Sequence, residues 1–273
     1  MFNSKYILAM KIVVFDLDET LGYFTQFGIF WDSLKKYLNS KEKQIEDNDF
    51  TNTLDLYPEF LRPNIINILN YLKKKMNGHC NKVLIYTNNI GPREWAEQIV
   101  SYFESKIEYK LFHQIIAAFK INGKRVEMGR TTQNKTHGDL IKCTKMPHDT
   151  EICYIDDVFY PGMANDNVYY INIKPYFYQL SFNEMVKRFI SSSLASRTNI
   201  ANETSDFFQF MTHNFNTYNY TVFKKNKKEY EIDKILGKHI IHHLQIFFGN
   251  TDKNKTFKNK SGKRNKTHKN YND

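Results

Sequence analysis

Two aspartates near the start of the chain have a spacing that suits acid–base chemistry. Asp16 and Asp18 follow the apolar run of residues 11–15, and Thr20 comes two residues later. The run has no polar alternation, which is typical of a strand buried on both faces. A spacing of two places both carboxylates on one side of the chain, and Thr20 is placed to hold the second carboxylate by a hydrogen bond. Because open α/β sheets bind ligands at the carboxyl ends of their strands, the pattern predicts a catalytic site there.

A surface loop that happens to contain two acids is the structural alternative to a catalytic pair. A chance match is less frequent directly after a buried strand than elsewhere in a chain. A calcium-binding loop is excluded, because Leu21 and Phe27 occupy the positions where an EF-hand needs Gly and Glu.

The elements that must position these residues alternate along the chain. β-branched and aromatic runs predict buried strands at residues 11–16, 82–87, 151–155 and 168–173. Apolar residues at helical spacing predict helices at residues 63–75, 92–105, 136–143 and 181–191. Such alternation makes βαβ units. We therefore expect an α/β fold, a Rossmann-like three-layer α/β/α sandwich with a parallel sheet.

Two insertions lie near the aspartates, at residues 22–60 and 88–134. Within them, the charged residues 40–49 predict a loop or cap, and Asn122-Gly123 predicts a hairpin turn. Neither insertion is long enough for a large cap domain. We therefore expect a small or absent cap and an open cleft, which favours macromolecular substrates over small metabolites.

The order of polar residues along the chain resembles that of a known superfamily. Residues 16–21, DLDETL, are similar to the first motif of the haloacid-dehalogenase-like superfamily, in the form typical of phosphatases that act on the RNA polymerase II C-terminal domain. Thr87 resembles the second motif, Lys135 the third, and Asp156-Asp157 the acidic fourth. Arg62-Pro63 resembles the turn that this branch carries before its first long helix. The resemblance covers about residues 10–190. The Asn- and Lys-rich composition is also similar to that of phosphatase-like proteins of large DNA viruses.

The resemblance implies a Mg²⁺-dependent phosphomonoester hydrolase that works through an aspartyl-phosphate intermediate. Asp16 is then the nucleophile, and Asp18 is the acid that protonates the leaving oxygen. Asp16, Asp18 through its backbone carbonyl, and Asp156 are the expected ligands of Mg²⁺. Thr20 and Asp157 are expected to position these groups without binding Mg²⁺ themselves, Asp157 by orienting a water.

Three further residues are expected to bind the phosphoryl oxygens and offset the charge of the carboxylates: Thr87, Asn88 and Lys135. The alternative interpretation of Thr87 is a threonine at the end of a strand with no functional role. Lys135 has competitors, because Lys124, Lys142 and Lys145 are close in sequence.

A phosphorylated protein is the substrate that this resemblance favours, which makes the chain a phosphoprotein Ser/Thr phosphatase. Two alternatives remain open. One is a phosphatase for 3′-phosphate ends of nucleic acids. The other is a catalytically silent scaffold that keeps the fold and binds partners.

Composition excludes several classes of protein. Of 273 residues, 41% are hydrophobic and 25% charged, which is globular rather than disordered or fibrous composition. The apolar runs are too short for a membrane span, and Lys11 interrupts the only apolar N-terminal stretch. Three Cys without C-x-x-C spacing argue against a disulfide framework or a zinc knuckle. We expect an intracellular protein, cytoplasmic or nuclear, with no membrane partner.

The chain divides into three parts by pattern. Residues 1–195 are the expected phosphatase domain, and residues 196–250 are an extension of unknown role with a helix predicted at residues 231–248. Residues 251–273 contain eight Lys or Arg and two Asp, a net charge of +6 out of +10 for the whole chain, and predict a disordered tail. This basic tail makes nucleic acid a second candidate partner.

Two weaker patterns lie in the extension. His239, His242 and His243 are interpreted as packed or solvated rather than metal-binding, because no companion acid accompanies them. The aromatic residues between Phe207 and Tyr220 are interpreted as core or interface rather than as a platform for nucleic-acid bases.

Overall fold

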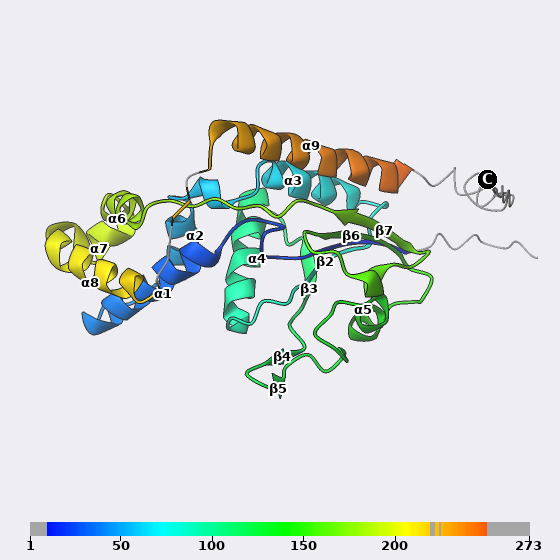
Figure 1. Ribbon diagram of the computed structural model, residues 1–273, viewed down its shortest axis with the longest axis horizontal. Helices are drawn as coiled ribbons and strands as arrows, with labels where there is room; N and C mark the ends of the chain where they lie inside the picture. Colours follow the sequence, from blue (N-terminus) through cyan, green and yellow to red (C-terminus); the bar gives the residue numbers. More distant parts are fainter. Residues whose placement is uncertain (1–9, 219–221, 224, 250–273) are drawn as a thin grey trace, which may run out of the picture.

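Five parallel strands form the central sheet of the computed structural model, which describes residues 10–218, 222–223 and 225–249. Their order across the sheet is β3-β2-β1-β6-β7 (Figure 1). The central strand is buried along its whole length, because it has strands on both sides and helices on both faces. The strands are β1 (Lys11–Phe15), β2 (Lys82–Tyr86), β3 (Phe112–Ile116), β6 (Glu151–Asp156) and β7 (Val168–Asn172).

Alternate side chains of β1 enter two hydrophobic clusters on opposite faces of the sheet. Val13 and Phe15 belong to the larger cluster, and Ile12 and Val14 belong to the smaller one. Helices α3 (Ile65–Lys75), α4 (Arg93–Ile107) and α9 (Lys227–Gly249) contribute to the larger cluster, and α5 (His137–Thr144) closes the smaller one. Figure 1 shows α3 and α9 on one side of the sheet and α5 on the other. The predicted Rossmann-like α/β/α sandwich is thus confirmed.

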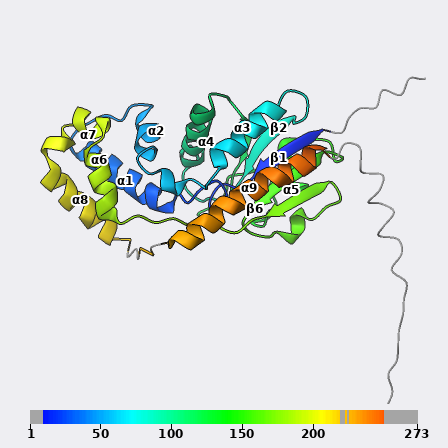
Figure 2. The same ribbon diagram turned by 90° about the horizontal axis from the view of Figure 1, so that it is seen from above.

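The insertion at residues 22–60 does not stand alone. It forms α1 (Thr25–Ser40), α2 (Asp49–Leu54) and the short turn η1 (Pro58–Phe60), and it packs against helices that come much later in the chain. These are α6 (Phe182–Ile190), α7 (Ser193–Arg197) and α8 (Thr204–Asn216), and the short turn η3 (Ile200–Asn202) packs on α7 and α8. We call α1, α2, α6, α7 and α8 the helical lobe; it lies at the left of Figures 1 and 2.

Aromatic contacts hold the helical lobe together. The ring of Tyr37 on α1 lies 5.0 Å from that of Phe207 on α8, and Phe30 lies 5.6 Å from Phe189 on α6. Each such contact adds about 0.5–1.5 kcal/mol beyond the area it buries. The sequence analysis did not predict α1. Its expected loop at residues 40–49 is confirmed only for the connection between α1 and α2.

The predicted turn at Asn122-Gly123 is confirmed as a hairpin between β4 (Lys120–Ile121) and β5 (Lys124–Arg125). Both turn residues have positive φ angles, 49° and 78°, as a two-residue hairpin turn requires. The hairpin extends away from the body of the sandwich (Figure 1).

The C-terminal helix α9 is longer than the predicted residues 231–248 and docks tightly on the domain. A Cβ added at Gly237 would lie 2.3 Å from the carbonyl oxygen of Pro63, so only glycine fits this contact. At the other end of α9, the Lys11 ammonium donates to the Phe247 carbonyl at 3.1 Å. The described part of residues 196–250 therefore shares its hydrophobic core with residues 1–195.

The weaker sequence patterns of the extension have packing roles. Phe207 and Phe215 are buried in the larger cluster, as the core interpretation predicts. Nδ1 of His243 lies 2.8 Å from the Tyr169 hydroxyl, which agrees with a packed histidine. Among the described residues, no helix is both long and apolar enough to cross a bilayer. The predicted tail at residues 251–273 lies outside the described residues.

Candidate active site

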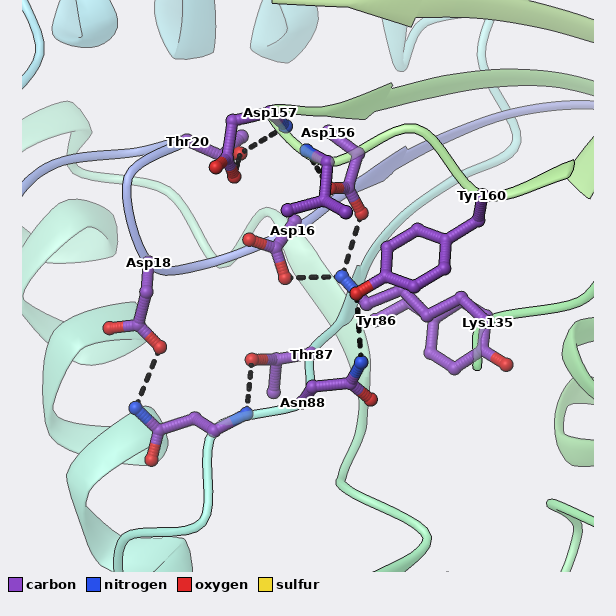
Figure 3. Close-up of polar contacts among 12 residues, drawn as sticks. Asp16, Asp18, Thr20, Tyr86, Thr87, Asn88, Lys135, Asp156, Asp157 and Tyr160 are labelled. Carbon is purple, nitrogen blue, oxygen red and sulfur yellow. Dashed lines mark hydrogen bonds and ion pairs between the residues drawn. The ribbon is translucent and has the colours of Figure 1, made fainter. Parts of the chain in front are cut away.

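Three neighbouring strands end at one hollow. Asp16 follows β1, Thr87 follows β2, and Asp156 closes β6. Since these strands are adjacent and parallel, their carboxyl ends bring the three side chains to the same edge of the sheet. The hollow measures about 360 Å³, and its lining includes every sequence-predicted site residue except Thr20: Asp16, Asp18, Thr87, Asn88, Lys135, Asp156 and Asp157 (Figure 3).

The Lys135 ammonium lies at the centre of the site. It donates to Asp16 Oδ1 at 2.5 Å and to Asp156 Oδ2 at 2.7 Å, and the Tyr154 hydroxyl also donates to Asp156. Lys135 directly precedes Thr136, whose hydroxyl caps α5 by accepting the Asp139 N–H at 3.1 Å. The cap fixes where α5 begins and so where the lysine stands. The competing Lys124, Lys142 and Lys145 are exposed.

Burial and charge set the protonation of this group. Burial raises the pKa of Asp16 to about 7, against the opposing pull of the Lys135 ammonium, and the Asp156 carboxylate raises it further. Burial alone would lower the pKa of Lys135, but the carboxylates of Asp16 and Asp156 outweigh burial and hold it above its usual value. One buried ammonium therefore faces more acid than it can neutralise, which leaves the site suited to an additional cation.

Asp18 lies apart from that group and is held by a residue that the sequence analysis missed. Asn89 donates its side-chain amide to Asp18 Oδ2 at 2.7 Å, and its backbone N–H donates to the Thr87 hydroxyl at 2.9 Å. Its side-chain oxygen accepts the Gly91 N–H at 2.7 Å. Burial raises the pKa of Asp18, and the Asn89 hydrogen bond opposes that rise. Asn89 thus links the first and second strand ends.

The expected contact between Thr20 and Asp18 is wrong. The Thr20 hydroxyl donates to Asp157 Oδ1 at 3.0 Å and accepts the Asp157 N–H at 3.2 Å. The chain turns sharply at Glu19, which has a positive φ of 53°, so Thr20 faces the end of β6 instead of Asp18. Its role is to fix Asp157.

Carboxylates gather in a way that suits a divalent cation. Asp16, Asp156 and Asp157 each offer one oxygen, and these oxygens all lie within 4.8 Å of one another. Three carboxylates form the hard oxygen donor set that Mg²⁺ prefers. The Asp18 carboxylate is not part of this cluster, because it points to Asn89. The expected ligation through the Asp18 backbone carbonyl stays a prediction. Asp157, which was expected only to orient a water, is itself a member of the carboxylate cluster.

Arg130 is a second residue that the sequence analysis missed. Its side chain is fully buried and lies over the Tyr86 ring, 4.8 Å from the ring centroid. The guanidinium donates to the Thr87 and Ala117 carbonyls, to Asn88 Oδ1 at 2.8 Å, and to the Gln133 carbonyl at 2.8 Å. It forms no ion pair with a carboxylate among the described residues. Arg130 therefore fixes the loop after β2 and the segment just before Lys135. Because no carboxylate neutralises it, its positive charge adds to the potential of the site.

The Asn88 side chain is held from both ends. Its oxygen accepts from Arg130, and its nitrogen donates to the Tyr160 hydroxyl at 3.0 Å (Figure 3). Its backbone N–H is the group expected to contact a phosphoryl oxygen. Because the side chain is occupied, it can hold that backbone in place.

Comparisons with known proteins identify no relative of this chain. A scan against protein-family models, a search of curated proteins and a search of solved structures each find no match for this chain.

Proposed function

We propose that the protein is a Mg²⁺-dependent phosphomonoester hydrolase that works through an aspartyl-phosphate on Asp16. The observation that supports it best is the division of labour between the two aspartates. Asp16 is paired with the Lys135 ammonium, and Asp18 is held separately by Asn89. This two-step hydrolysis needs two groups: a nucleophile next to a positive charge, here Asp16, and a separate acid that can protonate the leaving oxygen, here Asp18.

The first step transfers the phosphoryl group. An Asp16 carboxylate oxygen forms a bond to phosphorus while the bond to the leaving oxygen breaks, and Asp18 gives its proton to that oxygen. The raised pKa of Asp18 favours the protonated form that this step requires. The Lys135 ammonium and the backbone N–H of Asn88 bind the phosphoryl oxygens.

The second step restores the enzyme. Asp18, now a carboxylate, takes a proton from water, and the resulting hydroxide attacks phosphorus and displaces Asp16. Inorganic phosphate leaves, and Asp18 is again protonated. When bound by Asp16, Asp156 and Asp157, Mg²⁺ would supply positive charge to the transferring phosphoryl group.

For the substrate, we propose a phosphoserine or phosphothreonine in a protein. The hollow at the strand ends is open to the surface and joins further hollows beside the helical lobe, which suits a macromolecular chain. A nucleic-acid 3′-phosphate and a catalytically silent scaffold are the two competing outcomes of the test below.

The test is hydrolysis of a generic aryl phosphate with Mg²⁺ and with a chelator, followed by phosphopeptides, sugar phosphates and 3′-phosphorylated oligonucleotides. We expect Mg²⁺-dependent turnover and a preference for phosphopeptides that changes little with salt. A preference for oligonucleotides that collapses with added salt would favour the nucleic-acid alternative. Absence of turnover on every substrate would favour the scaffold.

A further inference from the structure

Three adjoining hollows run from the active site along the helical lobe. The active-site hollow shares Asp18, Thr25, Asn89 and Ile90 with a second hollow of about 440 Å³ between α1 and α4. This second hollow shares Glu94 and Gln98 with a third, of about 410 Å³, between α2 and α4. We call the second and third hollows together the trough. Figure 2 shows α2 and α4 standing side by side next to α1.

The floor of the trough is aromatic. Trp95 lines the second hollow, and Trp31 and Phe50 line the third. Their rings are in contact, since Phe50 lies 5.7 Å from Trp95 and 5.4 Å from Trp31. The Trp31 indole nitrogen is buried without a hydrogen-bond acceptor among the described residues. Because Trp31 is only 1% exposed, a bound chain cannot reach this nitrogen, and the half-buried ring of Trp95 is the part of the aromatic floor that a bound side chain can contact.

The rim of the trough is acidic, although the whole chain has a net charge of +10. Besides Asp18, five acids and one lysine line the trough: Asp32, Glu46, Asp47, Glu94, Glu97 and Lys35. Three of the acids have partners, since Asp32 pairs with Lys35, Glu46 with Arg197, and Glu97 with Arg93. Within the described part of the chain, Glu94 and Asp47 form no ion pair, and both are exposed. A polyanion is repelled by such a rim, and a cationic chain is attracted.

Asp18 connects the trough to the chemistry. It lines both the active-site hollow and the trough, and in the proposed reaction it protonates the leaving oxygen. The atoms attached to that oxygen therefore lie on the side of Asp18 where the trough opens. In a phosphoprotein these atoms are the serine or threonine side chain and the polypeptide that flanks it.

We infer that the trough binds the polypeptide segment on one side of the phosphorylated residue and selects basic and apolar side chains there. An apolar side chain packs on Trp95, and Lys or Arg side chains lie near Glu94 and Asp47. This inference rests on the proposed function, because it takes the phosphoryl group to lie at Asp16. It makes Glu94 and Asp47 specificity-determining residues outside the catalytic machinery.

The test compares two phosphoserine peptides of equal length, one with Arg and Leu around the phosphoserine and one with Asp and Ala. Binding of fluorescently labelled peptides is measured by anisotropy in chelator, and turnover is measured with Mg²⁺. The variant is Glu94→Gln with Asp47→Asn, and Glu108→Gln is the matched control, since Glu108 is an exposed acid at the other end of α4.

We expect the double variant to bind the basic peptide about tenfold more weakly and to lower its kcat/KM by a similar factor. Turnover of a small aryl phosphate, which does not reach the trough, is expected to be unchanged, and Glu108→Gln to match the wild type on all substrates. Equal binding of both peptides, or equal binding by wild type and double variant, would overturn the inference. Charge-dependent peptide binding without any phosphate hydrolysis would support the trough and contradict the proposed function instead.

Discussion

The carboxyl edge of the sheet and the trough beside it are built in opposite ways. At the sheet edge, Lys135 and Asp156 are 1% and 0% exposed, and each is fixed by hydrogen bonds from several elements. In the trough, Glu94 and Asp47 are exposed side chains without ion-pair partners among the described residues. Buried, mutually fixed groups suit chemistry, which needs exact placement, whereas exposed charges suit the selection of partners. Substitutions at the sheet edge should therefore alter turnover, and substitutions in the trough should alter preference.

The largest effect is expected from Asp16→Asn. The amide cannot form the acyl phosphate, so kcat on an aryl phosphate should fall by about 10⁴-fold or more. The fold should persist, as judged by circular dichroism and thermal melting, because Asn has nearly the same shape. Asp166→Asn is the control, since Asp166 is exposed and lies just before β7, at the edge of the parallel sheet opposite the site. Wild-type activity in Asp16→Asn would contradict the mechanism.

The next effect separates the two acids at the end of β6. Asp156 is fully buried and bonded to Lys135, whereas Asp157 is half-buried and held by Thr20. Asp156→Asn should raise the Mg²⁺ concentration for half-maximal activity by about 100-fold, and Asp157→Asn by about tenfold. The measurement is a Mg²⁺ titration of aryl phosphate hydrolysis. Equal shifts in both variants would show that the ligands are assigned wrongly.

A smaller effect on chemistry, with a clear effect on stability, is expected from Arg130→Met. The substitution removes the Arg130 donor from the carbonyls of Thr87, Ala117 and Gln133, so the free energy of unfolding should drop by about 2–4 kcal/mol. Loosening of Asn88 should weaken inhibition by inorganic phosphate about tenfold.

Denaturant unfolding and phosphate inhibition measure the two effects of Arg130→Met separately. Arg93→Met serves as its control, because Arg93 is exposed and bonded only to Glu97 among the described residues. Unchanged phosphate inhibition in a destabilised Arg130→Met variant would leave Arg130 a purely structural role.

The smallest effect is a pH dependence of stability in the metal-free protein. The pKa of Asp16 rises from 3.8 to about 7 on folding, so the folded state binds the proton more tightly. The resulting stabilisation is complete below pH 3.8 and is lost as the pH rises through about 7. Asn does not ionise, so the Asp16→Asn variant does not lose this stabilisation as the pH rises. In chelator, the melting temperature of the variant minus that of the wild type should therefore increase between pH 4 and 7. A constant difference across that range would show that Asp16 ionises normally.

Much of the sheet edge was predictable, because strand ends are visible in sequence. The apolar runs before Asp16, Thr87 and Asp156 predict strands of one parallel sheet, and the observed strand order, which makes them neighbours, brings the three residues together. Asn89 and Arg130 were not predictable in this way. They lie in loops, and their contacts depend on how those loops return to the strand ends. Arg130 is also buried with no carboxylate partner in the part of the chain that the structure describes, which differs from the usual exposure of charged residues.

The trough was hidden for a different reason. Its wall α1 does show helical spacing in the sequence, at Phe27, Phe30, Trp31, Leu34 and Tyr37, but the sequence does not show which later helices this face packs against. The edge strand β3 was missed because His113 and Gln114 interrupt its apolar run, which a half-exposed edge position tolerates. Sequence pattern thus finds the buried centre of this fold more readily than its margins.

The packing of α1 against α8 has a consequence for folding of the protein during translation. Phe30 on α1 has one ring partner close in sequence, Tyr57, but the ring partners of Tyr37 among the described residues, Phe207 and Phe210, lie on α8. More than 150 residues separate Tyr37 from Phe207 along the chain. During most of its synthesis, the nascent polypeptide therefore exposes the aromatic surface of α1 that later packs on α8. We therefore expect the helical lobe to form after release of the chain, and the yield of native protein to respond to chaperones that shield aromatic segments during translation.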